Sequence, residues 1–157
     1  MFLLLLEDMW PVRKINVEAI KILYDYMVQF EYVARIDLTT DRLYAHGMKD
    51  YATVSYLDLI VSMPGSDYHM SLQPGLWRKE HLLSVMERNW SAHQLELQGT
   101  PKLSHNRDVI VLGTKNWIYR HIHAIRFLDH QKLRLDDLKE SDVKAMRELG
   151  YFKAWEE

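Results

Sequence analysis

Apolar and polar positions divide the first part of the chain into short elements. Residues 2–6 (FLLLL) are apolar without interruption and are followed by Glu7 and Asp8. Such a run predicts a strand that is buried on both faces, as in a mostly parallel sheet. Ligands of open α/β sheets bind beyond the carboxyl ends of the strands, so Glu7 and Asp8 are candidate site residues. The alternative is a strand that simply ends in solvated acids.

A helical pattern follows over residues 17–30. Asn16 stands where an N-cap is expected, and apolar residues recur at three- and four-residue steps, which predicts one buried stripe. The stripe comprises Ile20, Leu23, Tyr24, Met27 and Val28. Residues 32–38 then alternate as a strand, and residues 53–62 predict a further strand or a short helix.

The stretch 68–96 predicts a compact recognition unit. Its pieces are a half-polar strand, a Pro-Gly turn, an amphipathic helix and a loop, over residues 68–73, 74–75, 77–88 and 89–96. The loop carries Trp90 and ends on Glu96 between two leucines. Aromatic rings stack on sugar C–H faces, and amide and carboxylate groups hydrogen-bond hydroxyls, so this unit suits a polyhydroxylated ligand.

The remaining elements are shorter. Residues 98–101 (QGTP) predict a break, residues 101–108 a polar loop, and residues 109–112 a short strand. Ser141 predicts the cap of a final helix that ends at Leu149, with Gly150 just after it. Residues 116–130 are rich in aromatic and basic side chains and show a period of two only in part, so their type stays open.

Composition narrows the class of protein. The 157 residues suggest one domain, and 48% apolar with 27% charged residues is typical of a globular protein. The net charge of −2 argues against a general nucleic-acid-binding surface. The chain has no cysteine, which excludes disulfides and thiolate metal sites and is compatible with the cytoplasmic location that we expect. No run is long enough for a membrane span, and residues 1–6 lack the basic region of a signal peptide.

Two motifs resemble those of a known enzyme family. Ser71-Leu72-Gln73, Leu76-Trp77, the following helix and Glu96 resemble the acceptor-side region of bacterial GT-A-type glycosyltransferases, which read S-L-Q-x-x-[IL]-W, a helix, then W-x-x-E. His93 replaces the aromatic residue that usually stands three positions before this glutamate. Residues 5–10 (LLEDMW) resemble the variant L-x-E-D-[FM]-[WFY] at the end of a central strand in that family, although a strict D-x-D is missing.

The resemblance implies a fold. Residues 1–157 would form a partial GT-A (nucleotide-diphospho-sugar transferase) fold, which is an α/β fold with a mixed sheet and flanking helices. In a complete domain of this type, the nucleotide-binding βαβ units come before the strand that corresponds to residues 2–6. We therefore expect the chain to be the C-terminal, acceptor-side part of a longer enzyme, and to be inactive by itself.

The resemblance also implies an activity. A sugar would pass from a nucleotide-sugar donor to a hydroxyl of a saccharide or other acceptor, in polysaccharide or glycoconjugate synthesis. Glu96 would act as the catalytic base that deprotonates this hydroxyl. The other implied contacts are with the donor diphosphate (Glu7, Asp8, Arg120, His121) and with the sugar or acceptor (Gln73, Trp77, Trp90). A divalent cation, Mn²⁺ or Mg²⁺, would be held in part by Asp8, because hard cations with oxygen ligands suit diphosphates.

Each of these residues also has an ordinary structural interpretation. Glu96 suits a solvated strand position, Trp77 a core aromatic, and the histidines of residues 116–130 a structural role. The rival hypothesis for the whole chain is a non-enzymatic module whose residues 115–134 bind nucleic acid or another anionic partner by phosphate charge and base stacking. Because groups that act on one substrate must converge, a transferase needs Glu96 and the acids after residues 2–6 to face a common cleft.

Overall fold

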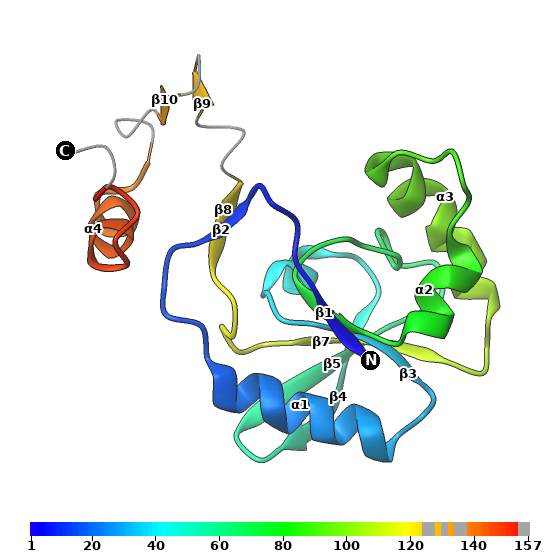
Figure 1. Cartoon of the computed structure of the whole chain (residues 1–157). Helices are drawn as coiled ribbons and strands as arrows, with labels where there is room; N and C mark the ends of the chain where they lie inside the picture. Colours follow the sequence, from blue (N-terminus) through cyan, green and yellow to red (C-terminus); the bar gives the residue numbers. More distant parts are fainter. Residues whose placement is uncertain (124–127, 130–131, 134–137, 154–157) are drawn as a thin grey trace.

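A mixed sheet forms the centre of the molecule. The structure is a computed structural model that describes residues 1–123, 128–129, 132–133 and 138–153. Among these residues the central sheet has six strands in the order β1-β6-β3-β7-β5-β4 (Figure 1). The strands are β1 (Phe2–Leu4), β3 (Val33–Asp37), β4 (Met48–Val54), β5 (Leu57–Ser62), β6 (Gly75–Trp77) and β7 (Ile110–Thr114). β3 and β7 are parallel, and the other neighbours are antiparallel.

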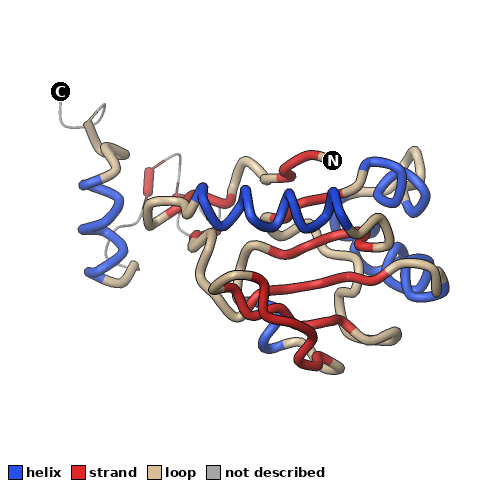
Figure 2. The backbone as a smooth tube through the Cα atoms, turned by 90° about the horizontal axis from the view of Figure 1, so that it is seen from below, coloured by secondary structure: helices blue, strands red, loops and turns tan. Residues whose placement is uncertain are grey.

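Helices cover this sheet on both faces. They are α1 (Val17–Gln29), α2 (Lys79–Val85), α3 (Ala92–His105) and a short 3₁₀ helix, η1 (Asp41–Tyr44). Neighbouring strand residues belong to different cores: Leu112 of β7 packs with α1, whereas Val111 packs with α2 and α3. Figure 2 shows α1 running alongside the strands from a second direction. The expected α/β class with a mixed sheet and flanking helices is confirmed.

The first helix agrees with its prediction. Asn16 Oδ1 accepts a hydrogen bond from Ala19 N at 3.0 Å and caps α1. The buried face, however, is centred on Ala19, Leu23 and Met27. Tyr24 and Val28 of the predicted stripe are 43% and 55% exposed.

The predicted burial of two strands is wrong. β1 is not a parallel strand buried on both faces; it pairs with β6 alone, antiparallel, at one end of the described sheet. Leu3 is therefore 40% exposed. β3, predicted to alternate, lies between β6 and β7 and is buried along its whole length. A strand's place in the sheet decided its burial, and that place depends on distant partners.

Residues 53–62 form neither a single strand nor a helix. They supply the end of β4, a tight turn at Ser55-Tyr56 and all of β5, with Val54 paired to Leu57. Ser55 adopts the left-handed conformation, with φ of 57°. Neither turn residue is glycine, which is why the turn is hard to see in the sequence.

The stretch 68–105 differs most from its prediction. Residues 68–73 contain no strand, and Gly75 begins β6 instead of completing a turn. The predicted loop ends at Ser91, which caps α3 together with Gln94 in a capping box. α3 then continues through Gly99 and Pro101, where a break and a polar loop were predicted. A Cβ on Gly99 would lie 3.0 Å from Met70 Cγ, so the helix approaches residues 68–73 closely at this glycine.

A smaller unit combines residues near the start of the chain with residues that come after β7. β2 (Met9–Pro11) pairs with β8 (His121–His123), and α4 (Glu140–Glu148) packs near them, away from the sheet (Figures 1 and 2). Its core contains Val12, Ile122, Met146 and Phe152. β9 (Leu128–Asp129) pairs with β10 (Lys132–Leu133). Gly150 has φ of +85° and ends α4 as predicted, although the N-cap is Lys139 and not Ser141.

No helix within the described residues is long and apolar enough to cross a lipid bilayer.

Candidate functional site

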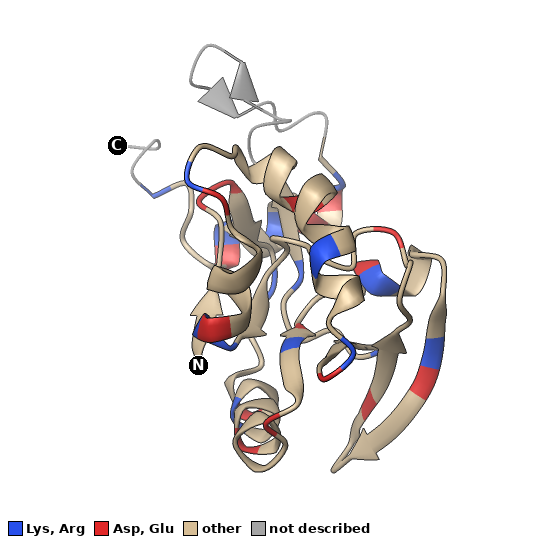
Figure 3. Ribbon diagram, turned by 90° about the vertical axis from the view of Figure 1, so that its right-hand side faces the viewer, with Lys and Arg blue, Asp and Glu red and all other residues tan. Residues whose placement is uncertain are grey.

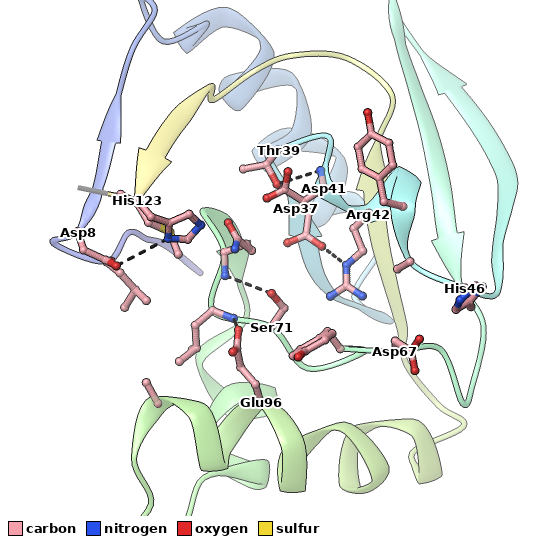
Figure 4. A pocket seen from close by; sticks show the side chains of 18 residues that line it. Asp8, Asp37, Thr39, Asp41, Arg42, His46, Asp67, Ser71, Glu96 and His123 are labelled. Atoms are coloured by element: carbon pink, nitrogen blue, oxygen red, sulfur yellow. Dashed lines mark hydrogen bonds and ion pairs between the residues drawn. The ribbon is translucent and has the colours of Figure 1, made fainter. Parts of the chain in front are cut away.

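A pocket of about 560 Å³ opens beside the carboxyl end of β3 (Figure 4). Five parts of the described chain line it: the β1–β2 connection, the end of β3 with η1 and the residues after it, residues 67–73, the first turns of α3, and β8. Their polar side chains include Asp8, Asp37, Asp41, Asp67, Glu96, Arg42, His46 and His123. The pocket therefore gathers titratable groups from across the sequence.

Three of the predicted site residues meet in this pocket. Asp8, Gln73 and Glu96 all line it. Asp8 lies with His123 at one side, and Glu96 projects from α3 (Figure 4). Glu7 is exposed and is not part of the lining. The required convergence of Glu96 with the acids after β1 is thus met through Asp8.

The carboxylate of Glu96 is fixed on one side only. Its Oε1 accepts a hydrogen bond from the backbone N–H of Leu72 at 2.8 Å. No described residue donates a hydrogen bond to Oε2. Glu96 lies on α3, not on a strand or at the end of a loop, and the helix holds its backbone rigidly. The carboxylate is therefore oriented while one oxygen stays available.

A buried charge cluster reaches the pocket through two of its three members, Asp37 and Arg42. Arg35, Asp37 and Arg42 are at most 4% exposed. Asp37 forms ion pairs with both guanidinium groups, through Oδ1 with Arg35 and through Oδ2 with Arg42. Burial lowers the pKa of Arg35 to about 10, and the charges of Asp37 and Glu96 oppose this shift. Arg35 therefore stays positively charged at neutral pH.

This cluster and α3 together hold residues 69–73. The segment has no regular secondary structure, so its backbone polar groups need partners from side chains. Arg42 Nη2 donates to His69 O (3.3 Å) and Arg35 Nη2 donates to Gln73 O (3.0 Å). Met70 N donates to Thr100 Oγ1 (3.1 Å), and Leu72 N donates to Glu96 Oε1 (2.8 Å). Side chains from β3, η1 and α3 replace the strand pairing that the sequence pattern predicted.

Two glycines make room for the arginines. A Cβ on Gly75 would lie 3.1 Å from Ile36 O and 3.2 Å from Arg35 Nε. A Cβ on Gly113 would lie 3.0 Å from the stem of Arg42. Both contacts are closer than ordinary packing allows, so the cluster requires small residues on β6 and β7.

His69 supports the same segment and is neutral at physiological pH. Its Nδ1 lies 2.8 Å from Ser62 Oγ, and both side chains are 3% exposed. Burial, assisted by the positive charges of Arg42 and Arg35, lowers the pKa of His69 to about 4. A histidine with so low a pKa is a weak base, so we assign it a structural role.

A histidine pair faces Asp8. The pairing of β2 with β8 brings His123 Nδ1 to 3.7 Å from Asp8 Oδ2. The ring of His121 lies 5.0 Å from that of His123 by centroids, and burial lowers its pKa. Asp8 Oδ1 is shielded from solvent without a hydrogen-bond partner among the described residues. The residues that the structure describes contain no cluster of three or more side chains of the kinds that bind metal ions.

The other predicted residues lie elsewhere. Trp77 is completely buried, and the Cζ atom of Arg35 lies 5.1 Å from the centroid of its ring. Trp90 packs against the core between α2 and α3, beside Lys102. Arg120 lies 3.6 Å from Asp142 and over the ring of Trp117. None of these side chains, nor that of His121, lines the pocket.

One sequence feature indicated the buried cluster, but it was hidden because residues 32–38 were interpreted as an alternating strand. Arg35 and Asp37 interrupt an otherwise apolar run, and charged residues are almost never fully buried unless they are paired. Asp41, Asp67 and His123 carried no comparable burial signal, because only the tertiary fold brings η1, the turn at Asp67 and β8 to the pocket.

Comparison of the chain with protein-family models, with curated proteins and with solved structures finds no match. The case for a function therefore depends on the sequence motifs and on the geometry of this pocket.

Proposed function

We propose that this chain forms the acceptor side of a GT-A-type glycosyltransferase, which moves a sugar from a nucleotide-sugar donor to a hydroxyl of a saccharide or other acceptor. The observation that carries the proposal is the convergence of Asp8, Gln73 and Glu96 on one pocket. The motifs assign these residues to the donor, the sugar and the proton transfer of a single reaction, and such groups must meet.

Glu96 is the proposed base. Its Oε2 would take the proton from the acceptor hydroxyl as that oxygen attacks the anomeric carbon, while the nucleoside diphosphate leaves from the opposite side. The Leu72 N–H holds the other oxygen and so keeps the carboxylate in one orientation. Gln73 supports the sugar contact, because its Oε1 is shielded from solvent without a partner among the described residues and can accept a hydrogen bond from a hydroxyl.

The charge of the pocket bears on the donor. Among the described residues, the lining contains five carboxylates, and Arg42 is its only arginine or lysine. A donor diphosphate would be repelled unless a cation accompanied it. Asp8 and His123 would together hold Mn²⁺ or Mg²⁺, with substrate oxygens and water completing the coordination, as is usual for Mg²⁺ at phosphate sites. The cation would neutralise the negative charge of the diphosphate.

The rival hypothesis of an anion-binding module stays a prediction. In the described part of residues 115–134, Lys115 lies 2.5 Å from Asp50 and Arg120 pairs with Asp142. Lysines and arginines are interspersed with acids on the described elements (Figure 3). These pairings reduce the positive charge available to a partner. Residues 124–127, 130–131 and 134 of that segment lie outside the described residues.

Thermal unfolding with a panel of nucleotide sugars tests the proposal. We expect at least one donor to raise the Tm of the chain, and to do so only with Mn²⁺ or Mg²⁺ present, because the pocket is acidic. Asp8→Asn should abolish the metal-dependent rise. Asp25→Asn, on the exposed face of α1, is the matched control and should leave the rise unchanged.

A rise that Asp8→Asn and Asp25→Asn affect equally would place the donor outside this pocket and would contradict the assignment. A well-folded chain that no nucleotide sugar stabilises, with or without cation, would contradict donor binding by this chain.

A further inference from the structure

A second pocket lies at the carboxyl end of α3. It measures about 720 Å³ and is lined by the end of β5 and the turn after it, the start of β7 and the last turns of α3. It shares no lining residue with the candidate site. Its apolar wall consists of Val61, Met63, Pro64, Pro101, Val109 and Ile110. A concave, mostly apolar pocket of this size with a few polar groups is typical of small-molecule sites.

The charge of this pocket is opposite to that of the candidate site. No carboxylate of the described residues lines it, whereas the lining includes Arg107 and His105. Arg107 is exposed and forms no ion pair among the described residues. Asp108 follows it in the chain but is not part of the lining. The carboxyl end of α3 contributes a partial negative charge of about half a unit, which is less than the full charge of Arg107.

One polar group inside the pocket lacks a partner. Ser104 Oγ is shielded from solvent and has no hydrogen-bond partner among the described residues. A serine hydroxyl within a helix can donate to the carbonyl four residues earlier, but here that bond is not formed. The other buried polar pair of the lining, Ser62 and His69, is satisfied internally. A ligand oxygen near Ser104 would therefore supply a missing acceptor.

We propose that this second pocket binds a single-chain anionic amphiphile. The hydrocarbon chain would lie against Val61, Val109 and their apolar neighbours, and the anionic head would lie at the rim beside Arg107. Arginine suits this role because its planar N–H donors match carboxylate and phosphate oxygens. The proposal is independent of the transferase proposal, since the two pockets are separate.

Dodecyl phosphate below its critical micelle concentration is the first probe. Titrated into the ¹⁵N-labelled full chain, it should shift amide signals of residues 61–65 and 100–110 and leave those around Glu96 nearly unchanged. Dodecyltrimethylammonium has the same chain with a cationic head and should bind at least roughly tenfold more weakly, because an ionic hydrogen bond is lost. Equal binding of the two probes, or signal changes outside the pocket, would overturn the proposal.

A charge-reversed pair of variants gives a second measurement. Arg107→Glu should weaken dodecyl phosphate at least roughly tenfold, whereas Arg88→Glu should leave the Kd unchanged. Arg88 is also exposed and lies outside the pocket, so it controls for the change in net charge. An equal effect of both variants would mean general electrostatic attraction and would refute a specific site. If Arg107→Glu did not fold, the head-group comparison on the native chain would decide.

Discussion

Glu96 Oε1 accepts a hydrogen bond from the backbone N–H of Leu72 at 2.8 Å. This contact, together with the hydrogen bonds between Thr100 and Met70, joins α3 to the irregular segment 69–73, and it leaves the second carboxylate oxygen facing the pocket. The same side chain is thus a support of the fold and the proposed base of the reaction. Substitutions at this position must separate the two roles.

Glu96→Gln makes that separation. The amide oxygen can still accept from Leu72 N, so we expect the Tm to change little, but an amide cannot take a proton. In an enzyme that joins this chain to the nucleotide-binding units that the proposal requires, transfer should fall by about 10²–10⁴-fold in kcat, the usual contribution of a general base. Release of nucleoside diphosphate in the presence of a saccharide acceptor measures it. Glu18→Gln, on the exposed start of α1, is the control; equal activity of the two variants would exclude Glu96 as the base.

Asp37→Asn tests the buried charge cluster. The substitution leaves Arg35 and Arg42 buried without their counter-ion. Removing one partner of a buried ion pair costs about 3–5 kcal/mol, and we expect a loss of that size in the free energy of unfolding in urea. Asp50→Asn breaks an exposed pair with Lys115 and should cost at most about 1 kcal/mol. Similar losses would show that burial of the cluster contributes little.

His69 predicts a pH dependence of stability. Its pKa is lowered from the ordinary value of 6.5 to about 4 in the folded chain. Below pH 6.5 the unfolded state therefore binds more protons, and stability should fall between about pH 6.5 and pH 4 and then level off. Across this pH range the free energy of unfolding should fall by about 3 kcal/mol, because a shift of one pKa unit corresponds to about 1.4 kcal/mol.

His69→Asn isolates this contribution from that of the carboxylates, because asparagine can still hydrogen-bond Ser62 but does not titrate. Urea unfolding at pH 7.5 and pH 4.5 should show a smaller loss for the variant than for the native chain. An identical loss in both would mean that His69 is not held neutral in the fold.

Ser91→Ala tests the start of α3. Ser91 Oγ accepts from Gln94 N at 3.2 Å, and Gln94 Oε1 accepts from Ser91 N at 2.8 Å. Loss of this cap should lower the free energy of unfolding by about 1 kcal/mol. Ser84→Ala, near the end of α2, is the matched control, because Ser84 is exposed and caps no helix. No difference between the two would show that the cap does not stabilise α3.

The local elements with an unambiguous signal could be predicted from the sequence. Asn16 and the helical period gave α1, and the C-terminal glycine gave the end of α4. The motifs around Asp8, Gln73 and Glu96 identified three residues that the fold brings to one pocket. These signals are encoded within a few residues, because caps and helix periods depend on neighbours in the chain.

Other features needed the tertiary structure. The burial of β1 and β3 depends on which strands lie beside them, and residues 69–73 take their conformation from side chains of β3, η1 and α3. α3 continues through Gly99 because the glycine lets it approach Met70, a contact that no local pattern reports. The sequence by itself determined the type of the strongly periodic elements and the chemistry that the pocket could hold. Long-range packing decided which charges are buried and which reach the pocket, since pairing between distant segments has no local signature.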